Sequence, residues 1–133
     1  MLPTSRLALA CLYLLVAPAC DDDPSGTPPS IDDLALTPTK VAVGSMTHQL
    51  QGSLHFTDPD ADVRDLEITL TPPTGAPSTL KVAIAGVDGK TEADTIFALA
   101  IMAPQAGRYE VRVVLIDAEG HMSAPDAVEI IAE

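Results

Sequence analysis

Apolar and polar residues alternate with a period of two along most of the chain after residue 30. The clearest run lies between Ala106 and Gly120, where one face carries Tyr109, Val111, Val113 and Leu115. This alternation is typical of a half-buried β-strand. The second half of the run, Val113 to Ile116, is apolar on both faces. It therefore predicts a central strand that is covered on both sides.

Seven further segments show short alternating or apolar runs separated by proline, glycine and aspartate turns. They are Ile31–Leu36, Lys40–Val43, Leu50–Phe56, Asp65–Leu70, Leu80–Ile84, Ile96–Met102 and Ala127–Ile131. The segment Ile96–Met102 is apolar throughout and also fits one or two buried helical turns, but its shortness and flanking turns favour a strand. The pattern predicts an all-β domain of seven to eight antiparallel strands, either a sandwich or a barrel.

The end of the chain carries a more specific motif. Gly107-x-Tyr109-x-Val111-x-Val113, followed by Asp117-x-x-Gly120-x-x-Ser123, resembles the last two strands of bacterial immunoglobulin-like modules of the polycystic-kidney-disease and fibronectin-type-III types. The resemblance implies an immunoglobulin-like β-sandwich over residues 31–133. It also implies that Tyr109 forms a tyrosine corner, with its hydroxyl bonded to the backbone near residues 104–106. The tryptophan and the disulfide of such domains are missing from the mature chain.

The N-terminus has the pattern of a secretory signal. Arg6 precedes an apolar run of eleven residues from Leu7 to Ala17, which is too short to span a bilayer. The residues that follow, Ala17-Pro18-Ala19-Cys20, resemble the lipobox of bacterial lipoproteins. By this resemblance residues 1–19 are a signal peptide and Cys20 is the lipidated first residue of the mature protein. An ordinary secretory signal is the alternative.

Residues 20–30 follow as an acidic, proline-rich tether with no residue that could seed a core. Residues 31–133 have the length of one domain. Cys11 lies in the signal and Cys20 would carry lipid, so no thiol remains for a disulfide or a nucleophile. The organisation predicts a location in the cell envelope, outside the cytoplasm and attached to a membrane. Asp21 leaves open whether that membrane is the inner or the outer one.

The chain is strongly acidic, with 19 acidic against 7 basic residues. Removal of residues 1–19 takes away only one base, Arg6, which leaves a formal charge of −13. Nucleic-acid binding is excluded because no basic patch is available to neutralise phosphates. The acidity has two interpretations, which are general solubility and the binding of a divalent cation.

The candidate metal site is a loop with alternating carboxylates, Asp58-Pro59-Asp60-Ala61-Asp62. Oxygen ligands at this spacing suit Ca²⁺, although the loop is not an EF-hand. It resembles the Asp-Pro-Asp-Gly-Asp loops of calcium-binding immunoglobulin-like and cadherin-like modules, with alanine in place of glycine. The expected topology adds carboxylates from two other segments at the same end of the sandwich, namely Asp117, Glu119, Asp32 and Asp33. The alternative is an ordinary aspartate-capped turn without a metal.

Other chemistry has little support in the sequence. His55 and His121 flank the two acidic loops, so they would form a zinc pair only if the loops brought them together. His48 has no such neighbour in sequence. No nucleophile elbow, catalytic thiol or aromatic pocket material is present, which indicates that the domain is not an enzyme.

Two functions remain. In the first, the domain is an interaction module that presents loops or an open strand edge to an envelope protein or a glycan. The exposed apolar residues that such a module needs are either Ala98, Ala100 and Met102, or Val114 and Ile116, if their outer face is uncovered. In the second, the domain is a passive structural or accessory unit of the envelope without a ligand of its own.

Overall fold

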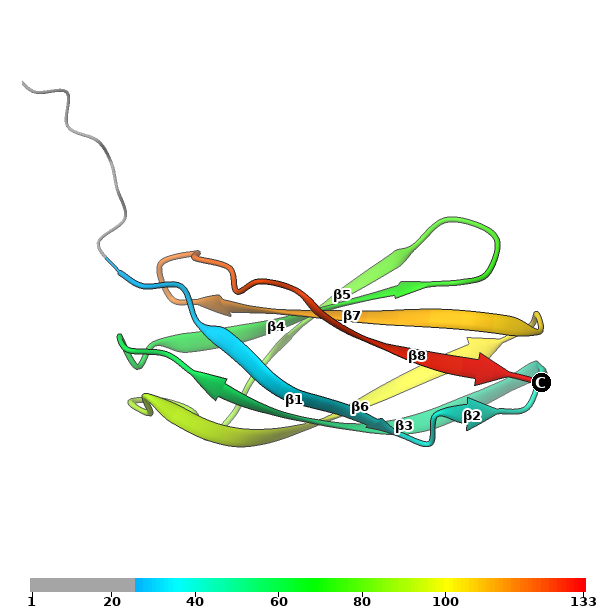
Figure 1. Cartoon of the computed structure of the whole chain (residues 1–133), viewed down its shortest axis with the longest axis horizontal. Helices are drawn as coiled ribbons and strands as arrows, with labels where there is room; N and C mark the ends of the chain where they lie inside the picture. Colours follow the sequence, from blue (N-terminus) through cyan, green and yellow to red (C-terminus); the bar gives the residue numbers. More distant parts are fainter. Residues whose placement is uncertain (1–25) are drawn as a thin grey trace, which may run out of the picture.

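The computed structural model describes residues 26–133 as two β-sheets packed face to face (Figure 1). The predicted signal peptide and Cys20 lie outside the described residues. There are eight strands: β1 Ser30–Thr37, β2 Lys40–Val41, β3 Gly44–Thr57, β4 Val63–Thr71, β5 Ser78–Ala83, β6 Glu92–Ala103, β7 Gly107–Asp117 and β8 Asp126–Ala132. No helix within this part of the chain is long and apolar enough to cross a membrane.

The smaller sheet has the strand order β1-β3-β6, and the larger has the order β2-β8-β7-β4-β5. The predicted immunoglobulin-like sandwich is therefore confirmed. All neighbouring strands are antiparallel except β2 and β8, which run parallel. This exception arises because the chain changes sheets around Pro38. Thr37 pairs with Gln51 in the smaller sheet, whereas Lys40 pairs with Ile131 in the larger one.

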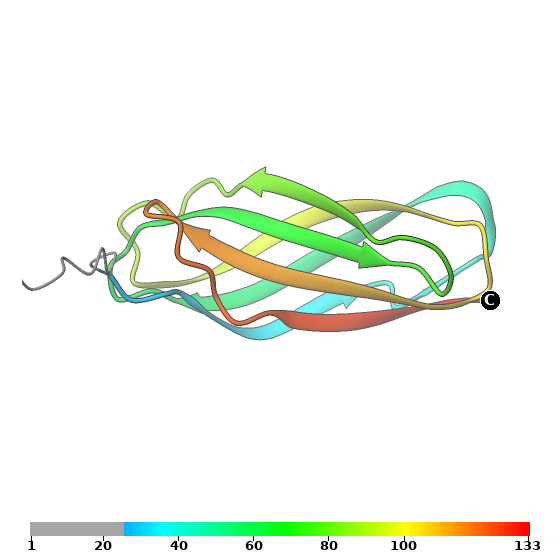
Figure 2. The same cartoon turned by 90° about the horizontal axis from the view of Figure 1, so that it is seen from above.

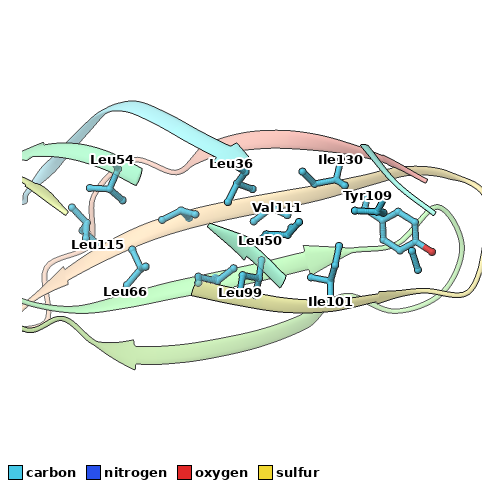
Figure 3. Packing of buried hydrophobic residues seen from close by; sticks show 14 of the residues in the cluster. Leu36, Leu50, Leu54, Leu66, Leu99, Ile101, Tyr109, Val111, Leu115 and Ile130 are labelled. Atoms are coloured by element: carbon cyan, nitrogen blue, oxygen red, sulfur yellow. The ribbon is translucent and has the colours of Figure 1, made fainter. Parts of the chain in front are cut away.

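The core lies between the sheets and follows the alternation of the sequence. Every second residue of β7 and of the second half of β3 points inward and meets the inner faces of β4 and β6 (Figure 3). The central position predicted for the Tyr109 strand is confirmed, since β7 lies between β8 and β4. The fully buried side chains include Leu50, Leu54, Phe56, Leu66, Ile68, Tyr109, Val111, Val113, Leu115 and Ile130.

The tyrosine corner is present. The Tyr109 hydroxyl donates to the carbonyl oxygen of Gln105 at 2.9 Å and accepts from the N–H of the same residue at 3.2 Å. The ring is buried, so both bonds are shielded from water. They fix the turn between β6 and β7 at the end of the sandwich opposite to the acidic loops, where the C-terminus also lies (Figure 1).

The segment Ile96–Met102 is a strand, in agreement with the favoured prediction, and belongs to β6. Within it, Phe97 pairs with Gly52 of β3 and its ring lies directly over the glycine. A Cβ atom at Gly52 would be only 2.1 Å from Cζ of Phe97. The glycine therefore makes room for an aromatic ring on the inner face of the smaller sheet, where a larger residue would overpack the core.

Candidate functional site

Two acidic loops meet at the end of the sandwich where the N-terminal segment enters (Figures 1 and 2). One is the β3–β4 loop with Asp58, Asp60 and Asp62, and the other is the β7–β8 loop with Asp117 and Glu119. We call these five residues the acidic pole. A backbone hydrogen bond from Ala118 N–H to the Asp62 carbonyl oxygen, 2.9 Å long, joins the two loops.

Asp58 organises the first loop. Its side chain is fully buried, and its two oxygens accept hydrogen bonds from the N–H groups of Asp60 at 3.2 Å and Asp62 at 2.9 Å. Such a carboxylate-capped turn is a local alternative to regular backbone pairing. Ala61 adopts a φ of 56°, in the left-handed region that favours glycine. This is the position at which the calcium-binding loops of the resembling modules carry glycine.

The three aspartates of this loop form a compact group of possible metal ligands. One carboxylate oxygen from each lies within 4.8 Å of the others. Oδ1 of Asp62 is buried without a hydrogen-bond partner. Burial, followed by a hydrogen bond with Asp58 and the negative charges of Asp117, Asp58 and Asp60, raises the pKa of Asp62 to about 6. The protein thus concentrates negative charge on an oxygen that it does not neutralise, an arrangement that a cation would stabilise.

Asp117 holds the second loop in the same manner. Its buried carboxylate accepts from the N–H groups of Glu119 at 3.0 Å and His121 at 2.7 Å, and it contacts Nδ1 of His121 at 2.6 Å. Burial alone would raise the pKa of Asp117, but the hydrogen bonds and charge of His121, together with the bond from Glu119, lower it overall. Asp117 therefore acts as a charged cap of its loop.

The last residues of the predicted tether lie against the acidic pole. The Thr27 N–H donates to Oδ2 of Asp60. Gly26 is so close that a Cβ atom there would be 2.9 Å from Cε1 of His121 and 3.1 Å from Oε2 of Glu119. Strand β1 begins at Ser30, so the predicted tether of residues 20–30 extends one residue too far. The chain that leads to Cys20 therefore leaves the domain directly from this pole.

Asp32 and Asp33 do not belong to the ligand group. Asp32 pairs with His55 in the β1–β3 ladder, three residues before Asp58, which corresponds to about 10 Å along a strand. Asp33 lines a shallow groove with His55 and Asp94. The topology brings all seven predicted carboxylates to the same half of the molecule, but only Asp58, Asp60 and Asp62 share a ligand-sized space.

The two histidines of the zinc hypothesis have separate aspartate partners. Nδ1 of His55 lies 2.9 Å from Oδ1 of Asp94, a contact that raises the pKa of His55, whereas Nδ1 of His121 contacts Asp117. Within residues 26–133, the one group of three or more metal-type ligands contains no histidine. The structure thus does not form the zinc pair.

A second feature is an uncovered apolar surface on β6. The outward-facing residues Ile96, Ala98, Ala100 and Met102 are all exposed, with exposed fractions of 71% for Ile96 and 58% for Met102. The alternative patch is covered, because Ile116 is buried and Val114 is half-buried. Sequence reasoning identified three of the four exposed residues but missed Ile96, whose alternation with its neighbours is the same signal.

Comparison with known proteins identifies the fold of the domain but does not assign it to a family. No known family profile matches the chain, and no curated protein matches it. The chain is similar in structure to the PKD domain of an M14-like peptidase from Thermoplasmatales archaeon SCGC AB-540-F20, with 18% identity and a TM-score of 0.52 over 81% of this chain and 98% of that one. A Niemann-Pick type C2 protein from the Japanese carpenter ant matches with 10% identity and a TM-score of 0.50, over 84% and 98% of the two chains. At these identities the likeness shows the fold alone, which is an immunoglobulin-like β-sandwich.

Proposed function

We propose that this chain is a lipid-anchored protein of a bacterial cell envelope whose immunoglobulin-like domain is an interaction module. The observation that supports an interaction module is the exposed apolar row Ile96, Ala98, Ala100 and Met102 on a strand at the edge of a sheet. Exposed apolar patches and open strand edges on small domains mark binding surfaces, because both leave favourable contacts unmade. The lipobox-like residues before Cys20 support the anchor.

Photo-cross-linking in cells tests the module. A photoreactive amino acid in place of Ala98 should give a discrete adduct, because this position lies in the middle of the proposed surface. The matched control replaces Arg112, which is exposed on the outer face of the other sheet. No adduct at Ala98, or the same adducts at both positions, would favour the passive structural unit instead.

The lipid anchor has its own test, since Cys20→Ala should prevent lipid attachment and leave the signal peptide uncleaved.

We also propose that the acidic pole binds Ca²⁺. The residues that would hold the ion are Asp58, Asp60 and Asp62, and the buried, unpartnered Oδ1 of Asp62 supports the assignment. Ca²⁺ is a hard cation that prefers oxygen ligands, and carboxylates of this number and spacing suit it. The ion would supply charge neutralisation rather than catalysis. It would stabilise the two loops and the adjoining Gly26–Thr27 segment together.

A thermal melt of the mature protein in excess calcium and in chelator tests this site. At a free calcium concentration of a hundred times the dissociation constant, binding should add about 2.7 kcal/mol to the free energy of unfolding. Asp60→Ala should abolish the calcium response, since Asp60 is the exposed ligand of the group. Asp94→Ala is the matched control, because the Asp94 side chain is exposed and, among residues 26–133, it contacts only His55. An undiminished response in Asp60→Ala would remove this loop from the site.

A further inference from the structure

The four strands at the edges of the two sheets differ in how they are protected against pairing with another chain. The edge strand β1 carries a bulge and a positive φ at Asp33, and β2 has only two residues. The edge strand β5 has six residues and carries Lys81, whose ammonium lies 3.6 Å from Asp65. Bulges, shortness and charges of this kind are the usual means of blocking an edge.

Strand β6 has such protection only at its start, where it carries Glu92 and Asp94. It is twelve residues long and pairs with β3 alone among the described strands. From Thr95 to Ala103 it contains no charged residue, no proline and no glycine. No described strand pairs with its backbone groups on the side away from β3, and a hollow separates part of this edge from residues 82–85. The exposed apolar row lies beside these unpaired groups.

The sequence of β6 is nearly symmetric about Leu99. Residues at equal distances on either side match in size and polarity: Ala98 with Ala100, Phe97 with Ile101, and Ile96 with Met102. Two copies of β6 placed antiparallel about a two-fold axis at Leu99 would put each of these residues opposite its match in the other copy. A self-complementary surface is the requirement for a two-fold dimer.

The charges at the ends of β6 select the same arrangement. Glu92 and Asp94 precede the apolar row, whereas the residues that follow it, Pro104 to Ala106, are uncharged. In the antiparallel arrangement Asp94 lies opposite Pro104 of the other copy, and the two Asp94 residues are separated by ten residues, or about 34 Å. Parallel in-register pairing would instead place the two Asp94 residues on neighbouring strands about 5 Å apart, where like charges repel.

We infer that the partner of the exposed β6 edge is a second copy of this chain, paired antiparallel through β6 and centred on Leu99. The two small sheets then join into one sheet of six strands in the order β1-β3-β6-β6-β3-β1. Because β6 begins at the end of the domain that holds the acidic pole, the two N-terminal segments leave the dimer at opposite ends. The inference rests on the proposed role of the domain as an interaction module and names the partner of that module.

A charge-pairing experiment on the full-length chain tests the register. In the proposed dimer residue 96 of one copy lies opposite residue 102 of the other. A chain with Ile96→Lys and Met102→Lys places like charges opposite each other twice, whereas Ile96→Lys with Met102→Glu places opposite charges there. Both positions are exposed, so both variants should fold, and they lose similar apolar surface. The lysine–glutamate variant should self-associate about tenfold or more tightly than the lysine–lysine variant in sedimentation equilibrium in density-matched detergent.

The lysine–lysine variant has the smaller net negative charge, so general repulsion between chains alone would make it associate more tightly than the lysine–glutamate variant, which is the opposite order.

A second measurement mixes chains carrying Ala98→Cys with chains carrying Ala100→Cys. A disulfide should form rapidly in the mixture and slowly in either chain alone, since these residues are opposite each other only between the two. An unmutated chain that stays monomeric at millimolar concentration, or equal association of the two charge variants, would overturn the self-pairing. If Ala98 then cross-links to a different protein, the proposed interaction module stands with another partner. If Ala98 gives no adduct, the proposal of an interaction module is contradicted too.

Discussion

Replacing Asp117 by alanine should lower the free energy of unfolding by about 3 kcal/mol at neutral pH, measured by chemical denaturation in excess chelator. Asp117 is 2% exposed, and its carboxylate accepts hydrogen bonds from two backbone N–H groups and from the His121 ring. Its removal leaves three part-buried donors without their charged acceptor, and such losses are among the largest that a single polar substitution causes. Asp126→Ala is the control. Within the described part of the chain the Asp126 side chain accepts a hydrogen bond only from its neighbour Ala127, so this substitution should cost less than about 1 kcal/mol.

The cost of Asp117→Ala should depend on pH in a defined direction. The pKa of Asp117 is lower in the folded protein than its ordinary value of 3.8. A lowered pKa means that the unfolded state takes up protons first on acidification, so the stabilisation is complete above pH 4 and is lost as the pH falls through the folded value. The difference between the unmutated protein and the variant should therefore shrink below pH 4. A difference that stays constant down to pH 2 would show that the charge of Asp117 is not what holds the loop.

Most strands were predictable from the sequence because they are covered on one face, so apolar and polar residues alternate; β5 alternates in sequence although all six of its residues are exposed. The starts and ends of the strands were less accurate. Strand β3 runs from Gly44 to Thr57, whereas the alternation predicted only Leu50–Phe56. The first half of β3 pairs with β6, but it has no buried face, so its residues do not alternate between apolar and polar. Conversely, the strand predicted over Lys40–Val43 covers only Lys40–Val41 in the structure, since only these two residues pair with the parallel strand β8.

The acidic pole was predictable in part. Sequence spacing placed Asp58, Asp60 and Asp62 together because they share one loop, and strand order placed Asp117 and Glu119 at the same end. The exclusion of Asp32 and Asp33 depends on the register of β1 against β3, which side-chain contacts across the sheet decide and which the local pattern does not contain. The sequence likewise gives no sign that β6 lies at an edge, since strand order in a sheet results from pairing between residues far apart in the chain.

Replacing Asp58 by alanine should lower the free energy of unfolding by about 3 kcal/mol even in chelator, and it should also abolish any response to calcium. Asp58 is fully buried, and the β3–β4 loop folds around its two oxygens through the N–H groups of Asp60 and Asp62. Removing the Asp58 charge also relieves its repulsion with the Asp62 carboxylate. This gain offsets only part of the cost, because Asp58 is one of several charges that raise the pKa of Asp62. Asp58→Asn, which keeps the shape and one acceptor oxygen, should recover about half of the stability.

The comparison with Asp60→Ala separates the two roles that a carboxylate can have in this loop. Asp60 is exposed, so its removal should cost less than 1 kcal/mol in chelator while still removing the calcium response. Asp58 shapes the loop and is a candidate ligand, whereas Asp60 is mainly a candidate ligand. Equal costs for the two variants in chelator would mean that Asp58 does not hold the loop. A calcium response that survived both substitutions would leave Asp58 as a turn cap and the loop without a metal.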